Sequence, residues 1–182
     1  TLFESKASEK NITLEFNEDK SIPEYLIFDN TRMKQVISNL LSNAIKFTPE
    51  QGIVTLSTKL ISKDENQAKL YVEIKDTGIG ISKEKIDLIF NPFSQADASI
   101  SKEFGGTGLG LSIISKILEL MDSKIKVKSK TNKGSKFFFE ISFDLVKDQE
   151  IIEEKEAKKE CSLHLEGKIL VADDNPMNQQ LM

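Results

Sequence analysis

Residues 31–47 read TRMKQVISNLLSNAIKF, and their side chains separate into two faces at helical spacing. Apolar side chains recur every three or four positions, which is the period of an amphipathic helix. Because the residue before a proline avoids helical geometry, Pro49 predicts that this helix ends at Phe47. The apolar face consists of Met33, Val36, Ile37, Leu40, Leu41, Ala44 and Ile45.

The opposite face of this helix carries a polar stripe without any acidic residue. Asparagine is only a middling helix former, so propensity does not explain two of them one turn apart. An amide oxygen can bind Mg²⁺ and a lysine can bind phosphate, so the stripe fits a metal–phosphate site about as well as a solvated face. Spacings of four, four and three residues align Gln35, Asn39, Asn43 and Lys46.

The flanking sequence predicts strands on both sides of the helix. Two short strands are expected at about 12–16 and 25–28, and a hairpin with its turn at 63–67 follows. A short helix (83–90), a loop (91–110), a helix to Met121 and two strands (125–129 and 136–143) complete the pattern. The prediction is an α+β fold, a two-layer α/β sandwich whose mixed sheet of about five strands is covered on one face by about three helices.

Asp76 continues the alternation of the second hairpin strand. Because it has the same parity as Val72 and Ile74, its carboxylate is expected to point toward the core, where an unpaired charge costs roughly several kcal/mol. Gly78 and Gly80 follow, and without side chains they leave the backbone room to approach a flat ligand. A plain Asp-x-Gly turn at the end of a strand is the alternative interpretation.

A second glycine-rich stretch, FGGTGLGL at residues 104–111, stands directly before a helix. Backbone N–H groups and the positive end of the helix dipole make such a turn suitable for phosphate. The stretch is neither a Walker lysine loop nor a Gly-x-Gly-x-x-Gly sequence after a strand. By itself it fits a flexible connection equally well.

Composition excludes several classes of protein. The 182 residues are 38% hydrophobic and 30% charged, which is typical of a soluble globular domain. No apolar run approaches the ~20 residues of a membrane helix. The net charge is −4 and the lysines are interspersed with acidic residues, so no nucleic-acid partner is expected. A single cysteine, Cys161, suits a reducing cytosol, with membrane attachment of a parent protein left open. The start at Thr1 indicates a piece of a longer protein.

Taken in order, these stretches resemble four sequence boxes of the sensor histidine kinases. The N box corresponds to 39–48, the first glycine box to 76–80, the phenylalanine box to 90–93 and the second glycine box to 105–110. The resemblance covers about 12–145 and implies an ATP-binding catalytic domain, related to the gyrase, chaperone and mismatch-repair ATPases. It further implies that the γ-phosphate of ATP passes to a histidine, with ATP and Mg²⁺ as cofactors.

The resemblance also assigns roles to single residues. Asp76 would accept a hydrogen bond from the adenine amino group. Asn43 would bind Mg²⁺ with support from Asn39, and Lys46 would approach the phosphates beside the aromatic ring of Phe47. The further expected nucleotide contacts are Gly78, Gly80, Ile81, Phe93, Lys102, Gly106, Thr107, Gly108, Leu109, Gly110, Leu111 and Ser135.

Two of these contacts have an equally good alternative. The segment from Phe93 to Phe104 resembles the lid over ATP, and Lys102 within it is either a phosphate contact or a solvated lysine. Ser135 matches a small hydroxyl residue near the base, and turn chemistry explains it as well.

The resemblance divides the chain into four parts. Residues 1–10 are the end of a preceding dimerisation helix or linker, 11–146 the catalytic domain, 147–166 a charged linker and 167–182 the truncated start of a receiver domain. In the last part, Asp173 and Asp174 match the acidic pair that holds Mg²⁺ in a complete receiver domain.

The acceptor histidine of the family lies on a dimerisation domain, in a motif that begins with His-Glu, and no such motif occurs here. His164 is interpreted as an ordinary exposed histidine. The fragment is therefore expected to bind ATP as a monomer without phosphorylating itself. Its expected partners are the histidine-bearing dimerisation domain of a homodimeric parent kinase, and the receiver domain of the same chain or a response regulator.

Two rival functions remain. One is an ATP-hydrolysing conformational switch of the gyrase or chaperone type, but those enzymes carry a glutamate base where this chain has Asn39. The other is a non-catalytic nucleotide-binding scaffold, against which the intact boxes argue.

Overall fold

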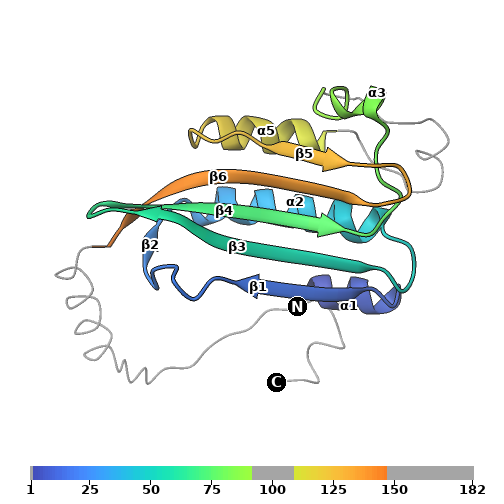
Figure 1. Cartoon of the computed structure of the whole chain (residues 1–182), viewed down its shortest axis with the longest axis horizontal. Coiled ribbons are helices and arrows are strands. Elements are labelled where there is room, and N and C mark those ends of the chain that lie inside the picture. Colours follow the sequence, from blue (N-terminus) through green and yellow to red (C-terminus); the bar gives the residue numbers. More distant parts are fainter. Residues whose placement is uncertain (1, 92–108, 147–182) are drawn as a thin grey trace, which may run out of the picture. The chain divides into compact units, whose positions relative to one another are not determined.

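A six-stranded mixed sheet with helices against one face forms the frame of the protein (Figure 1). The computed structural model describes residues 2–91 and 109–146, which belong to a compact unit that runs from Thr1 to Val146. The strands are β1 (Thr13–Glu18), β2 (Leu26–Ile27), β3 (Ile53–Lys63), β4 (Gln67–Asp76), β5 (Lys126–Ser129) and β6 (Ser135–Leu145). The described helices are α1 (Leu2–Glu9), α2 (Asn30–Phe47), α3 (Lys83–Ile86) and α5 (Gly110–Glu119).

The strand order is β1-β3-β4-β6-β2, and β5 pairs with β6. β1 lies parallel to β3, and the other pairs are antiparallel. The predicted hairpin is confirmed as β3 and β4, with one shift of register between Leu60 and Ser62. In the β4–β6 pair Lys75 stands opposite Lys136, so the end of β4 lies beside the start of β6.

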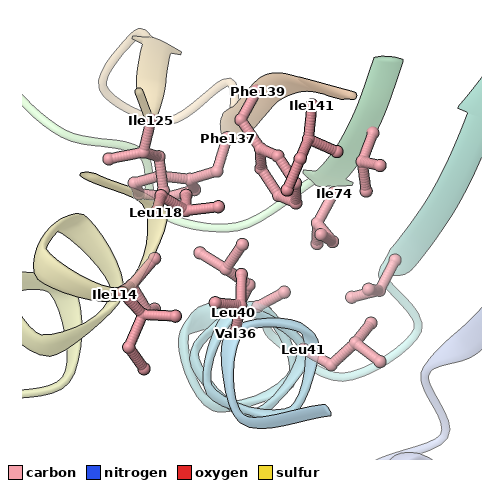
Figure 2. Packing of buried hydrophobic residues seen from close by; sticks show 14 of the residues in the cluster. Val36, Leu40, Leu41, Ile74, Ile114, Leu118, Ile125, Phe137, Phe139 and Ile141 are labelled. Atoms are coloured by element: carbon pink, nitrogen blue, oxygen red, sulfur yellow. The ribbon is translucent and has the colours of Figure 1, made fainter. Parts of the chain in front are cut away.

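The core lies between the sheet and the two longer helices, α2 and α5. Figure 2 shows Val36 and Leu40 of α2 between Ile114 of α5 and the side chains of β4 and β6. Val36, Leu40 and Ile114 are at most 1% exposed, and burying such a side chain contributes about 1.5–3 kcal/mol. The predicted apolar face of α2 is therefore confirmed.

Both ends of α2 are capped by side chains close to them in the sequence. The carboxylate of Asp29 accepts the backbone N–H of Arg32 at 3.0 Å and so caps the start of the helix. At the other end the hydroxyl of Thr48 donates to the carbonyl of Ala44 at 2.7 Å, immediately before Pro49. The helix begins one residue earlier than predicted and ends at Phe47, as predicted.

Other elements differ from the expectation in length and number. The sheet has six strands where about five were expected, because β1 and β2 both join the sheet. The helix predicted over 83–90 is an α-helix only for the four residues Lys83–Ile86, and hydrogen-bonded turns follow. The predicted loop lies almost wholly outside the described residues. No helix in the described ranges has the length and apolar content that a bilayer span requires.

Candidate functional site

Asp76 is the last residue of β4, and its side chain points into the protein, as the alternation predicted. The residue is only 6% exposed. The backbone N–H groups of Gly78 and Ser135 donate to Oδ1 of Asp76 at 2.8 and 3.1 Å. These two donors come from the loop after β4 and the start of β6, and they supply the partners that a buried carboxylate requires.

The second carboxylate oxygen of Asp76, Oδ2, takes part in neither hydrogen bond. In the part of the chain that the structure describes, every fully buried side-chain nitrogen or oxygen has a hydrogen-bond partner, so Oδ2 touches solvent. Burial raises the pKa of Asp76, and the two N–H donors offset part of that increase. The carboxylate is thus fixed through one oxygen, and the other oxygen remains available as an acceptor.

Gly78 and Gly80 bring stretches of backbone close together. A Cβ atom at Gly78 would lie 2.4 Å from the carbonyl oxygen of Phe47, and one at Gly80 would lie 2.1 Å from that of Lys130. Gly80 also has a φ of +69°, which L side chains rarely adopt. The space was expected to admit a flat ligand, but at these two positions the protein's own backbone occupies it. The glycines hold the loop after β4 against the end of α2 and the β5–β6 turn.

Ser129, at the end of β5, organises the same region and was missed in the sequence. Its Oγ accepts the backbone N–H of Ile81 at 2.7 Å and donates to the carbonyl of Gly134 at 3.0 Å. The hydroxyl groups of Ser129 and Ser135 also lie 3.0 Å apart. No local pattern marks this serine, because one of its partners, Ile81, lies 48 positions earlier in the chain.

The polar stripe of α2 lies beside the start of α5. Asn39, Asn43 and Lys46 are half-buried, whereas Gln35 is exposed. A Cβ atom at Gly110 would lie 3.9 Å from Nδ2 of Asn43, so this amide adjoins the first residue of α5. The structure therefore brings the N box next to the end of the second glycine box.

Lys46 and Phe47 connect the stripe to the Asp76 region. Nζ of Lys46 lies 4.9 Å from the centroid of the Phe47 ring, within the range of a cation–π interaction. Burial lowers the pKa of Lys46. The carbonyl of Phe47 accepts the backbone N–H of Ile79 at 3.2 Å. The end of α2 and the first glycine box are thus joined directly.

The remaining predicted residues divide into two groups. Ile81 and Leu111 are half-buried and pack against the hydrophobic core, while Leu109 precedes the first residue of α5. The other group lies outside the described residues and comprises Phe93, Lys102, Gly106, Thr107, Gly108, His164, Asp173 and Asp174.

One known protein family matches most of the described unit. Residues 28–145 match the family described as histidine kinase-, DNA gyrase B- and HSP90-like ATPases, which is more than half of the chain. The chain belongs to this family. Within it, the histidine kinase branch provides the similar relatives and structures described next.

Similar relatives include a fungal and a bacterial histidine kinase. This histidine kinase-like ATPase domain is 42% identical over 137 residues to the peroxide stress-activated histidine kinase mak2 of Schizosaccharomyces pombe, covering 74% of the chain and 6% of that protein. It is 40% identical over 145 residues to the signal transduction histidine-protein kinase BarA of Escherichia coli K12, covering 80% of the chain and 16% of BarA. The chain thus spans only a small part of these relatives.

Solved structures show the same fold. A crystal structure of full-length ShkA in complex with AMPPNP superposes with a TM-score of 0.65 at 30% identity, covering 80% of this chain and 28% of that chain. The catalytic domain of the histidine kinase ThkA superposes with a TM-score of 0.63 at 35% identity, covering 77% and 84% of the two chains. The described unit is an ATP-binding catalytic domain of the histidine kinase type, as its sequence boxes predicted.

Proposed function

We propose that this domain delivers the γ-phosphate of Mg-ATP to a histidine on a separate dimerisation domain of a hybrid two-component kinase. The observation that carries the proposal is the carboxylate of Asp76. It is buried, it is fixed through Oδ1 by two backbone donors, and its Oδ2 takes part in neither of these hydrogen bonds.

The Asp76 carboxylate suits an adenine amino group. Its Oδ2 can accept one hydrogen bond, and the orientation of that oxygen is set by the N–H groups of Gly78 and Ser135. A guanine base presents a carbonyl at the corresponding position, so two acceptors would face each other. Selection of ATP over GTP follows from this arrangement.

The phosphate side of the site would be formed by α2 and the start of α5. The amide oxygen of Asn43 would hold Mg²⁺, together with oxygens of the phosphates, and Asn39 lies one turn earlier on the same face. Lys46 would offset phosphate charge, as would the backbone N–H groups and positive dipole end at Gly110. When bound, Mg²⁺ supplies charge neutralisation for phosphoryl transfer.

Further parts of the proposal concern residues outside the described ranges. Phe93, Lys102, Gly106, Thr107 and Gly108 would be further contacts of the nucleotide. Asp173 and Asp174 would belong to the metal site of a complete receiver domain. The proposed partners are the dimerisation domain of a homodimeric parent and a receiver domain, in the cytoplasm. The relatives BarA and mak2, of which the chain spans a small part, support the context of a larger kinase.

Hydrolysis of the gyrase type is disfavoured at Asn39. An asparagine amide does not take up a proton near neutral pH, so it cannot activate water as a general base. The half-buried Asn39 faces the same side of α2 as Asn43, where a base for water would be needed.

A thermal-shift titration tests binding first. Mg-ATP and Mg-ADP should raise the melting temperature and Mg-GTP should not. Adding the histidine-bearing domain of the parent should then yield acid-labile phosphate on that domain. Stabilisation by no nucleotide would favour the scaffold function, and release of phosphate without a labelled histidine domain would favour hydrolysis.

A further inference from the structure

Lys10 closes the C-terminal end of the helix that carries the proposed phosphate contacts. Its Nζ donates to the carbonyl oxygens of Ile45 at 3.1 Å, Lys46 at 2.9 Å and Thr48 at 3.2 Å. The last carbonyls of a helix lack intrahelical partners, and the negative end of the helix dipole lies there. A half-buried ammonium group therefore satisfies three acceptors where its charge is also favoured.

The carbonyls that Lys10 binds belong to the functional end of α2. The carbonyls of Lys46 and Thr48 lie on either side of Phe47 in the chain. The carbonyl of Phe47 is left for the N–H of Ile79, which lies in the first glycine box. The position of Lys10 consequently affects the backbone of both Lys46 and Phe47, and through Ile79 the loop that fixes Asp76.

The backbone that carries Lys10 is itself held firmly. After α1 ends, the carbonyl of Ala7 accepts the N–H groups of Lys10 and Ile12 at 3.2 and 2.8 Å, and Asn11 adopts a left-handed φ of +54°. Ala7 and Ile12 are 2% and 6% exposed and belong to the core. This turn connects α1 to the start of β1, so a displacement of α1 would move Lys10 along with it.

We propose that Lys10 is a positioning residue for the nucleotide site, acting through the last turn of α2, and that it couples the placement of α1 to nucleotide affinity. The inference rests on the proposed function, because it assumes that Lys46 and Phe47 contact the nucleotide. Lys10 itself points at the carbonyls of the helix, and it acts only through the residues whose backbone it holds.

The test compares three variants of the whole chain by calorimetric titration with Mg-ATP. Lys10→Met keeps most of the side-chain volume and removes the donors, Lys10→Arg keeps the charge, and Lys6→Met is the matched control on the exposed side of α1. Lys10→Met should weaken Mg-ATP binding about three- to tenfold, which is the range expected for a charge at a helix end. Lys10→Arg should recover at least half of the loss on a logarithmic scale, and Lys6→Met should bind like the wild type.

Hydrogen exchange separates positioning from a general loss of stability. In Lys10→Met the amides of Thr48 and Ile79, both hydrogen-bonded at this end of α2, should exchange faster. The amides at the centre of β4, such as that of Val72, should keep their wild-type rates. Wild-type affinity in Lys10→Met, or acceleration that is as large at Val72 as at Ile79, would overturn the proposal.

Failure of the proposed function would look different. If the wild-type chain binds no adenine nucleotide, the proposed function fails and the coupling to affinity fails with it. Exchange at Thr48 and Ile79 would still show whether Lys10 holds the end of α2.

Discussion

The backbone N–H of Ser135 donates to the carboxylate of Asp76 at 3.1 Å, across 59 positions of the sequence. This bond joins the last residue of β4 to the first residue of β6, and it fixes one oxygen of a carboxylate that is almost fully buried. The orientation of the proposed adenine-binding group therefore depends on the pairing of two strands, and not on the Asp-x-Gly sequence alone.

Asp76→Asn should weaken Mg-ATP binding by about ten- to a hundredfold, since a hydrogen bond to a charged group contributes roughly 1.5–3 kcal/mol. An asparagine can still accept both N–H groups through Oδ1, but it places an NH₂ donor where Oδ2 was. Titration calorimetry measures the change, with Asp87→Asn as the exposed control. Equal affinities of Asp76→Asn and the wild type would show that the carboxylate does not bind the nucleotide.

The same substitution should raise the melting temperature of the nucleotide-free protein at neutral pH. The folded pKa of Asp76 is raised above its ordinary value of 3.8, chiefly by burial. Its contribution to the free energy of unfolding is thus fully present below pH 3.8 and is lost as the pH rises through the raised pKa. The advantage of Asp76→Asn should accordingly be larger at pH 7.5 than at pH 4.

Calorimetric scans of both proteins at these two pH values check this expectation. A melting-temperature difference between wild type and Asp76→Asn that does not change with pH would show that burial of the charge is not what costs stability.

Gly134→Ala should destabilise the fold strongly. Gly134 has a φ of +84°, and a Cβ atom there would lie 2.0 Å from the carbonyl oxygen of Asp76. The strain and the clash together should lower the free energy of unfolding by about 2–4 kcal/mol, as measured by urea denaturation. Gly110→Ala is the matched control, because the nearest atom, Nδ2 of Asn43, is 3.9 Å from its Cβ position. A loss in Gly110→Ala as large as that in Gly134→Ala would contradict this account.

Asn43→Ala should remove most of the dependence of ATP affinity on magnesium. The amide oxygen of Asn43 is the proposed protein ligand, so the ratio of ATP affinities with and without Mg²⁺ should fall by about tenfold. Binding of adenosine, which has no phosphate, should be unchanged. Gln35→Ala, on the exposed start of the same stripe, is the control. If the ratio of ATP affinities with and without Mg²⁺ is the same in Asn43→Ala as in the wild type, residues other than Asn43 bind the metal.

Much of this fold follows from local sequence patterns. The helix predicted over 31–47 is observed as Asn30–Phe47, and the hairpin arms form β3 and β4. Both predictions succeeded because hydrophobic periodicity and the stop at Pro49 act over a few residues. The inward direction of Asp76 was predictable for the same reason, since parity along a strand fixes the face on which a side chain lies.

Elements that depend on distant partners were predicted less well. α3 is shorter than its apolar pattern indicated, and β2 has only two residues, Leu26–Ile27, because it pairs with just the last residues of β6. Gly78 and Gly80 were assigned to ligand access, whereas the structure packs the backbone of Phe47 and Lys130 against them. A glycine in a sequence marks a position without a side chain, but it does not show which neighbour fills the space beside it.

Sequence patterns alone indicated most of the elements, the buried faces of α2 and β4, and the family to which the ordered boxes point, because these depend on periodicity and on the kinds of residue in short stretches. The three-dimensional packing was needed to show that the N–H of Ser135 holds Asp76, that Ser129 binds the N–H of Ile81, and that Lys10 binds the end of α2. The physical reason is that these are hydrogen bonds between segments far apart in the chain. Strand order and helix packing bring the donor and acceptor groups together, and no local sequence pattern shows which groups will meet.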